Sequence, residues 1–354
     1  MKKLIKYIFI FTAVASLYTA PVFAGNEDRA GQAGANELLI NPWARSSGWG
    51  GCNLALVRGV ESFGVNIAGM GHNKGTEVVF AQTDWLKGSD IKISSFGIAQ
   101  KVGESGSMGL SVSSMKFGDI ERTTEAQPDG GLGVFSPQFL TIGFSYAKSF
   151  SNSIFGGMSV KMISESINDV KAQGLVVDAG IQYVTGFNEE KDNLKFGISL
   201  RNVGTPMKFD GEGLSYRNDN AGANINVLQQ QRTERFEMPA LVAIGIAYDI
   251  KLNQDHRITP AASFTSNSFI RDQIGIGAEY GFRQLFMFRA GYTFDKKDKN
   301  AIFDEEIAAL IGFSAGVSVQ VPLGKSGKSF GIDYGYRATE TFDGTHTIGA
   351  RFNL

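Results

Sequence analysis

Segments of alternating side chains recur from about residue 77 to the last residue, and they constrain the fold more than any other feature of the chain. In the final nine residues every second position is apolar: Ile348, Ala350, Phe352 and Leu354. Successive side chains of a strand point to opposite faces, so this segment predicts a ribbon with one apolar and one polar face. Elsewhere, as around Arg289, the second face carries charges among glycines. Such a face suits the lumen of a barrel whose other face meets lipid, and it is a poor interior for a dry sandwich.

Counting these segments gives fourteen strands, an even number, as single-chain outer-membrane barrels prefer. Most reach the roughly 9–11 residues that a tilted spanning strand needs. A large soluble antiparallel sandwich would show similar alternation and is the alternative fold. The expected strands are Glu77–Trp85, Ile91–Val102, Met108–Arg122, Phe139–Phe150, Ile154–Ile167, Gly174–Val184, Leu194–Val203, Ala240–Ile250, Arg257–Thr265, Gln273–Phe282, Leu285–Phe294, Ile307–Val321, Ser329–Ala338 and Thr345–Leu354.

The predicted fold class is therefore all-β, a 14-stranded antiparallel transmembrane barrel of the outer-membrane type with an N-terminal hatch segment. The lengths of the connections agree with it. Those after even-numbered strands are mostly brief, whereas the two longest, Thr123–Gln138 and Gly204–Pro239, follow odd-numbered strands. With the N-terminus in the periplasm, the long loops are extracellular and the short turns periplasmic. Thr185–Asn193 is a moderately long exception among the periplasmic turns.

Composition excludes several other classes of protein. Mean hydropathy is -0.07, and no apolar run of about 20 residues follows the N-terminus, so a bundle of membrane helices is excluded. A net charge of -1 offers no basic surface for nucleic acid. The three histidines lie far apart in sequence, without metal-ligand spacing, and no nucleophile-elbow sequence occurs. We therefore expect no catalytic residue, no metal site and no cofactor, and a protein that is not an enzyme.

The first residues have the features of an export signal. Lys2, Lys3 and Lys6 precede an apolar stretch, and Val22-Phe23-Ala24 forms a small-x-small cleavage sequence. The alternative is an N-terminal anchor helix. The sequence thus divides into a signal peptide over residues 1–24 that is cleaved near Ala24, a hatch or plug segment over residues 25–76, and a transmembrane barrel over residues 77–354. The single cysteine, Cys52, permits no internal disulfide and is expected to be a small buried residue.

The hatch segment shows no sustained strand pattern. Pro42 removes a ladder hydrogen bond, and neighbouring glycines permit close approach of the backbone. We expect Ala35–Gly75 to fold inside or across the periplasmic mouth, with Arg45 facing lumenal carboxylates such as Asp178, Glu279 or Asp333. An ordinary extension on the surface is the alternative.

Charged and polar side chains on the predicted lumenal faces form a second candidate feature: Asp178, Gln182, Arg201, Glu279, Arg289, Asp333, Arg337 and Arg351. Unpaired charges are unfavourable in a packed lumen, so these groups should pair with one another or meet water. A salt-bridge network that holds the plug is the favoured interpretation, and a polar permeation path is the alternative.

The connection Gly204–Pro239 is far longer than a strand connection requires, and long loops commonly carry binding. It mixes polar residues with apolar and aromatic ones: Phe209, Leu214, Tyr216, Ile225, Val227, Leu228 and Phe236. Exposed apolar side chains in a loop are unfavourable unless they pack locally or meet a partner. The loop is therefore either a partner-binding surface or a lid over the barrel mouth.

Several stretches resemble one known family. The residues Leu38, Pro42, Ala44, Arg45, Gly48 and Gly51 fall in a stretch that is similar to the start of mature PorV/PorQ proteins of the type IX secretion system of Bacteroidota. The turn Asn66–Met70, which includes Gly69, resembles that family's asparagine-proline-alanine-glycine-leucine turn, with Ile67 where proline usually stands. Further similar stretches are Gly118–Ile120, Leu140–Ala147, Gly156–Lys161, Asp178–Tyr183, Leu200–Gly204 and Pro239–Leu241.

The resemblance implies a fourteen-stranded outer-membrane barrel like the long-chain fatty-acid transporters, with a hatch. It also implies partners: translocon and attachment-complex proteins of the secretion system, secreted cargo domains, and outer-membrane lipid, but no nucleic acid. PorV-like members bind the C-terminal signal domain of cargo, and PorQ-like members anchor surface components of the attachment complex. The competing function is a transporter of hydrophobic small molecules. The long loop favours the binding function.

Overall fold

A computed structural model describes residues 29, 31–187, 190–220, 225–295, 310–324, 327–339 and 342–354. For residues 187, 190–191, 218–220 and 225–227 the description covers the backbone alone. The predicted signal peptide lies outside the described residues, as do residues 307–309, where the twelfth strand was expected to begin.

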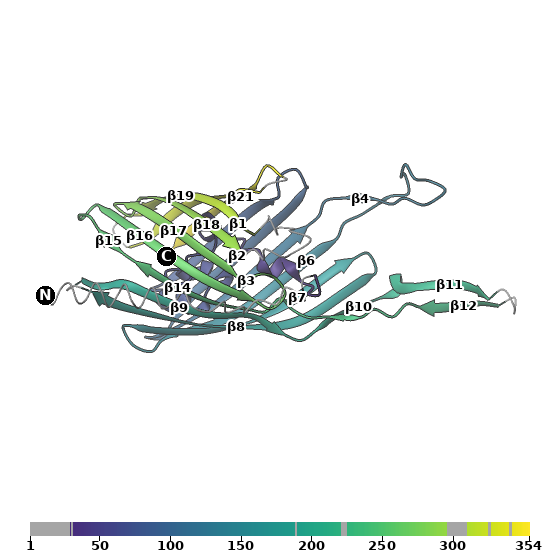
Figure 1. Ribbon diagram of the computed structural model, residues 1–354, viewed down its shortest axis with the longest axis horizontal. Coiled ribbons are helices and arrows are strands. Elements are labelled where there is room, and N and C mark those ends of the chain that lie inside the picture. Colours follow the sequence, from purple (N-terminus) through teal and green to yellow (C-terminus); the bar gives the residue numbers. More distant parts are fainter. Residues whose placement is uncertain are drawn as a thin grey trace, which may run out of the picture.

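The described residues form a closed barrel of fourteen antiparallel strands, which confirms the predicted fold class (Figure 1). Closure is made by β1, which pairs with β2 on one side and with the last strand, β21, on the other. Closing the sheet leaves no free strand edge in the wall. The barrel strands are β1 Thr76–Trp85, β2 Ile91–Val102, β3 Gly106–Lys116, β6 Gln138–Ser149, β7 Ile154–Ile167, β8 Val170–Phe187, β9 Glu190–Gly204, β14 Leu241–Tyr248, β16 His256–Asn267, β17 Gln273–Phe282, β18 Phe286–Asp295, β19 Gly312–Pro322, β20 Ser329–Arg337 and β21 Thr345–Asn353.

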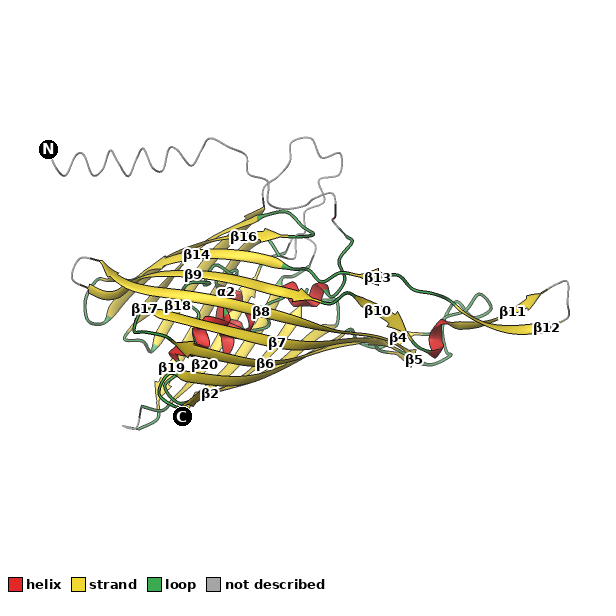
Figure 2. Cartoon of the chain, turned by 90° about the horizontal axis from the view of Figure 1, so that it is seen from below, coloured by secondary structure: helices red, strands yellow, loops and turns green. Residues whose placement is uncertain are grey.

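Shorter strands extend the wall or form arms beyond it. β15 (Ile250–Lys251) pairs with β16, and β10 (Met207–Asp210) pairs with β8 and β13 (Arg235–Phe236). Two arms project past one end of the barrel (Figures 1 and 2). The first pairs β4 (Ile120–Glu121) with β5 (Val134–Phe135). The second pairs β11 (Ser215–Asn220) with β12 (Ile225–Gln230), next to the 3₁₀-helix η6 (Glu212–Leu214). We call the end with the arms the long-loop end and the opposite end the short-turn end.

Several predicted strand boundaries differ from the structure, and two of the differences have a clear physical reason. The expected strand Met108–Arg122 ends at Lys116, because the chain turns at Gly118, where φ is +76°, and Ile120 then pairs in the first arm. The expected long turn Thr185–Asn193 is mostly strand, since β8 runs to Phe187, which pairs with Glu190 at the start of β9.

The two faces of the wall differ as the alternation predicted. Along β21, Ile348 is 58% exposed on the outer face, whereas Thr347 and Arg351 are buried on the lumenal face. On β18, Phe288 and Tyr292 point outward while Arg289 and Thr293 are buried. The barrel therefore presents an apolar outer surface and a polar lumen. None of the helices in the described part of the chain is long and apolar enough to cross a membrane.

Residues 31–75, which we call the hatch, run through the lumen from the long-loop end to the short-turn end. Near the long-loop end, Ala33 forms a parallel bridge with Glu237. At the other end, the backbone N–H of Thr76 donates to the carbonyl of Leu354. Between them lie η3 (Asn36–Leu39), α2 (Ala44–Gly48), η4 (Gly59–Gly64) and η5 (Ile67–His72), which appear in red inside the barrel in Figure 2. The hatch thus occupies the length of the lumen rather than the short-turn mouth alone.

Small residues let the hatch backbone touch the wall. A Cβ atom built on Gly48 of α2 would lie 2.8 Å from the Cα of Gly316 in β19. A Cβ on Gly335 of β20 would press against the carbonyl oxygen of Ala44 and lie 3.1 Å from the nitrogen of Gly48. Real Cβ atoms are not found so close to backbone, so glycine at these positions is what permits α2 to dock.

We predict that Gly335→Ala loosens the hatch, because overpacking a close backbone contact costs about 1–3 kcal/mol. Hydrogen exchange of the α2 amides should become faster while the barrel strands stay protected. Gly281→Ala is the matched control, since a Cβ there meets its nearest neighbour at 3.7 Å. Equal α2 protection in the two variants would contradict the prediction.

Candidate functional site

Arg45 of α2 lies in the lumen, but its closest carboxylates differ from those expected. Its Nε lies 3.2 Å from Glu61 Oε1, and its Nη2 lies 3.8 Å from Glu77 Oε1. Glu61 belongs to the hatch and Glu77 to the adjacent wall strand β1. The expected ion-pair partners Asp178 and Glu279 are therefore wrong, because α2 docks against β19 and β20, where Glu61 and Glu77 lie closer to Arg45.

Asp333 contributes to the same charge cluster without a direct ion pair to Arg45. Burial alone would lower the pKa of Arg45, but the carboxylates of Glu61, Asp333 and Glu77 outweigh it and raise the pKa. The acids are also held by the hatch backbone: Ser46 N–H donates to Glu61 at 3.0 Å, and Val60 N–H donates to Glu77 at 2.6 Å. The cluster thus ties α2 and η4 to β1.

Most of the other predicted lumenal charges have partners. Arg289 Nη2 lies 2.9 Å from Glu279 Oε2, and Arg351 Nη2 lies 3.5 Å from Asp333 Oδ1. Asp178 pairs with Lys161. The sequence prediction missed three of these partners: Lys161, Glu61 and Glu77. Strand alternation could have found Lys161 and Glu77, because both stand at lumenal positions of their strands. Gln182 donates to the carbonyls of Leu54 and Val57 in the hatch.

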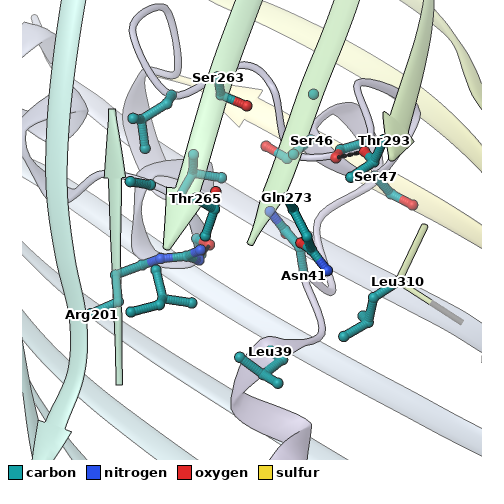
Figure 3. Close-up of a pocket in the computed structure, with 18 of the residues that line it drawn as sticks. Leu39, Asn41, Ser46, Ser47, Arg201, Ser263, Thr265, Gln273, Thr293 and Leu310 are labelled. Atoms are coloured by element: carbon teal, nitrogen blue, oxygen red, sulfur yellow. Dashed lines mark hydrogen bonds between the residues drawn. The ribbon is translucent and has the colours of Figure 1, made fainter. Parts of the chain in front are cut away.

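Arg201 and Arg337 differ from these, since neither has a carboxylate within 4 Å among the residues that the structure describes. Arg201 Nη1 donates to the carbonyl of Gly64 in the hatch. Both arginines line one cavity of about 80 Å³ between the hatch and the wall, which we call the polar cavity. Figure 3 shows the guanidinium of Arg201 reaching toward Thr265, with Gln273 and Asn41 side by side nearby.

A larger cavity of about 580 Å³ opens at the long-loop end, and we call it the mouth cavity. Its lining is mainly apolar and includes four aromatic rings, those of Trp85, Phe117, Phe139 and Phe269. Its volume falls within the range of roughly 300–1,000 Å³ that is usual for small-molecule sites. The two cavities share lining residues, among them Leu39, Trp85 and Leu310, so they adjoin.

Glu37 of η3 lies beside the mouth cavity with both carboxylate oxygens sealed from solvent and without a hydrogen-bond partner among the described side chains. Burial raises its pKa to about 8, and the charge of nearby Glu165 adds to the shift. Glu37 also lines a separate cavity of about 80 Å³ between the hatch and the wall, together with the basic residues Lys161 and Arg201. At neutral pH the Glu37 side chain is therefore mainly protonated in the docked hatch.

The remaining residues of the predicted hatch motif are structural. Asn66 caps η5 through Ala68 N–H at 3.2 Å and donates to the carbonyl of Ile181 in β8 at 3.1 Å. Gly69 packs against the carbonyl of Val57. Leu38 packs on a cluster that includes Met207 and Met238, and Ala44 is buried. Gly51 adopts a positive φ of 86°. The carbonyl of Pro42 accepts a hydrogen bond from the Thr83 hydroxyl at 3.5 Å.

The residues of the predicted partner-binding loop separate into two groups. The rings of Phe209 and Phe236 lie 5.5 Å apart between centroids with their planes tilted by 37°, and both pack against the cluster around Met207, so they support the wall. Tyr216 and Leu228 are 51% and 69% exposed on the β11–β12 arm, and Leu214 is partly buried in η6. The side chains of Ile225 and Val227 lie outside the described residues. The β11–β12 arm extends away from the mouth instead of folding over it (Figure 2).

His72 and Cys52 are the potentially reactive side chains of the hatch. Within the described ranges, no group of three or more His, Cys, Asp or Glu side chains is arranged to hold a metal ion. His72 stacks on Phe155 at 3.7 Å, and burial lowers its pKa to about 3, so it stays neutral. Cys52 is buried, and burial raises the pKa of its thiol to about 12.

Glu37→Gln should remove a pH dependence of hatch docking. The docked state holds the Glu37 proton to about pH 8, whereas a released side chain ionises near its ordinary pKa of about 4.3. The hatch therefore docks most strongly below about pH 4.3. Above that pH the free energy of docking becomes less favourable by up to roughly 1.4 kcal/mol per pH unit, until Glu37 also ionises in the docked state. Exchange of the η3 amides should be faster in the native chain than in Glu37→Gln at pH 9, and equal at pH 4. A native chain as protected as the variant at pH 9 would refute this.

A filled lumen also predicts a closed pore. The full chain in a planar bilayer should give no steady current, because the hatch and its paired charges occupy the path along the barrel axis. A general porin reconstituted in the same way is the positive control. Porin-like open-channel currents from this chain would show that the hatch does not seal the lumen.

Comparison with solved structures supports the barrel fold. The toluene transporter TodX of Pseudomonas putida is similar with a TM-score of 0.55 at 12% identity, over 88% of this chain and 97% of that chain. The toluene transporter TbuX of Ralstonia pickettii is similar with a TM-score of 0.51 at 14% identity, over 88% and 97%. At these identities the likeness establishes the fold alone. A search of curated protein sequences finds no significant match.

A sequence family assigns the barrel more closely. The family described as type IX secretion system membrane protein PorP/SprF matches residues 84–352, from the end of β1 to the end of β21. The predicted secretion system and outer-membrane location are therefore supported, while a specific PorV or PorQ identity stays a prediction. Together with the closed barrel and its apolar outer face, this match identifies the chain as a member of the PorP/SprF family of outer-membrane proteins of the type IX secretion system.

Proposed function

We propose that this barrel binds secreted cargo, or anchors a cell-surface component of the secretion system, through the β11–β12 arm. The observation that carries the proposal is the contrast between the filled lumen and the exposed arm. The hatch fills the lumen, whereas the arm stands clear of the wall with Tyr216 and Leu228 exposed. The protein acts without catalysis or cofactor in this proposal.

The arm has features of a surface that is completed by a partner. An isolated two-stranded hairpin is marginally stable in water, and here β11 and β12 pair only with each other among the described strands. Tyr216 is held in place by its hydroxyl, which donates to Gln229 at 3.0 Å. Large exposed aromatic and aliphatic side chains are frequent anchors of protein interfaces. Long-loop ends of such barrels face the cell exterior, where secreted proteins would be met.

The proposal keeps the domain division given by the sequence. Residues 1–24 act as a signal peptide cleaved near Ala24, residues 25–76 as the hatch segment, and residues 77–354 as the barrel. Its partners are secretion-system proteins and cargo domains, in the manner of PorV-like shuttles or PorQ-like anchors.

A second candidate function is transport of hydrophobic small molecules. The aromatic lining and size of the mouth cavity favour it, and the two similar solved structures are described as toluene transporters. The polar, ion-paired path beyond that cavity argues against passage of an apolar molecule along the barrel axis.

The double variant Tyr216→Ser/Leu228→Ser tests the binding function. Loss of two interface anchors, each worth about 2 kcal/mol or more, should reduce co-purification of secretion components or cargo from native outer membrane by at least tenfold. Leu252→Ser/Leu323→Ser, which changes two exposed leucines in short turns, is the matched control. Heat-modifiable migration on gels verifies barrel assembly in both. Undiminished partner recovery with an assembled barrel would place the partner surface elsewhere.

A further inference from the structure

We propose that the outer wall of the barrel holds a binding site for a phosphorylated glycolipid of the outer leaflet, with the phosphate between Lys92 of β2 and Lys116 of β3. The site lies on the lipid-facing side of the wall, at the base of the first arm. Neither the lumen nor the β11–β12 arm takes part in it. The proposal therefore goes beyond the binding of secreted proteins and names a membrane component that this barrel selects.

The two lysines face each other directly across neighbouring strands. Lys92 and Lys116 are Cα partners in the β2–β3 ladder, and both side chains are exposed on the outer face. Their chain neighbours Ile93 and Met115 are buried on the lumenal side, which fixes the outward direction of the lysines. Like charges directly opposite each other on a strand pair are destabilising. Among the described residues, neither ammonium group has a carboxylate within 4 Å, so an anion bound between them would remove the repulsion.

These lysines line a shallow hollow of about 740 Å³ on the outer wall, where β1, β2, β3 and β6 lie side by side. Its other lining residues in the described chain are Gln82, Thr83, Asp84, Ser94, Ser114 and Gln138. Two lysines and one aspartate leave a net charge of +1 in the hollow. Asp84 stands opposite Lys92 on β1, on the side away from Lys116, so it leaves the space between the lysines to an anion.

Neutral hydrogen-bonding groups complete the hollow and favour a sugar beside the phosphate. The Gln138 amide donates to the Ser114 hydroxyl at 3.1 Å, and the Ser94 hydroxyl donates to the Gln82 amide oxygen at 2.7 Å. These contacts hold the four side chains on the outer face. The amide oxygen of Gln138 and the amide nitrogen of Gln82 can still accept from and donate to the hydroxyl groups of a sugar. A phosphorylated glycolipid carries both groups, whereas phosphatidylethanolamine has no sugar.

The hollow adjoins the apolar outer surface along the same two strands. From the lysine pair toward the short-turn end, the next outward pairs of the ladder are Ser94–Ser114 and Phe96–Val112. Lys92 and Phe96 are about 13 Å apart along the strand and less in depth, because barrel strands are tilted. Lysine stems can lie along apolar surface and shorten this distance further. Long-loop ends face the exterior, so the acyl chains of an outer-leaflet lipid would lie against exposed Phe96 with the phosphate at the lysines.

Native mass spectrometry of the purified full chain in detergent, titrated with matched lipids, tests the site. Monophosphoryl lipid A should bind at least about tenfold more tightly than the same glycolipid without its phosphate, as expected for charge-assisted hydrogen bonds. Phosphatidylethanolamine should bind no better than the dephosphorylated glycolipid, and inorganic phosphate should compete only weakly, because it lacks acyl chains. Equal binding of the two glycolipids would overturn the proposal. So would phosphatidylethanolamine that binds as tightly as monophosphoryl lipid A, or inorganic phosphate that displaces this lipid at equal concentration.

Substitutions locate the phosphate. Lys92→Gln/Lys116→Gln should weaken the binding of monophosphoryl lipid A about tenfold and abolish the preference over the dephosphorylated glycolipid. Lys92→Arg/Lys116→Arg should keep that preference, because arginine also binds phosphate. Lys148→Gln/Lys328→Gln, which changes two exposed lysines at the short-turn end, is the charge-matched control and should bind like the native chain. If the glutamine variant assembles, as judged by heat-modifiable migration, and keeps the preference, the site does not exist. An equal loss in the control would show a general attraction of charges and would also exclude the site.

Discussion

The width of a fourteen-stranded barrel is the constraint on which the rest of this structure depends. Side chains alone fill the interior of a barrel of about eight strands, and wider barrels enclose space that must hold water or polypeptide. Here the hatch occupies that space, and it imposes two requirements on the wall. Inward positions such as Gly316 and Gly335 must be small where backbone meets backbone, and buried charges such as Glu77 must meet a hatch partner. The same residues therefore belong to the fold and to the closure of the lumen.

Sequence alone predicted the wall well, because lipid on one side and a polar lumen on the other impose alternation on every strand. The alternation around Arg289 and Ile348 is preserved in the structure for this reason. Prediction from this alternation was wrong at the ends of strands, where the chain leaves the membrane. The charged run near Glu190 resembled a turn although β9 already begins there, and the pattern through Ile120 continued into an arm that has left the wall.

Contacts of the hatch were less predictable, because its path follows no periodic pattern. A lumenal carboxylate for Arg45 was expected, but the choice of Glu77 depends on where α2 docks, and that position is determined by close contacts with β19 and β20. Likewise, Phe209 and Phe236 could not be separated from Tyr216 by composition. The first two pack together beside η3 and the third lies on a projecting arm, which only the course of the loop reveals.

The hatch is held unevenly, and this difference bears on access to the lumen. At η5, Asn66 is fully buried, caps its helix and binds β8, so release there would break several hydrogen bonds at once. At η3, contacts are mainly apolar, Glu37 is sealed without a partner, and the mouth cavity lies directly beside the segment. Local opening in proteins follows the regions with the fewest stabilising contacts. Movement of η3 alone would leave the contacts of α2 and η5 with the wall in place, so the barrel would stay closed.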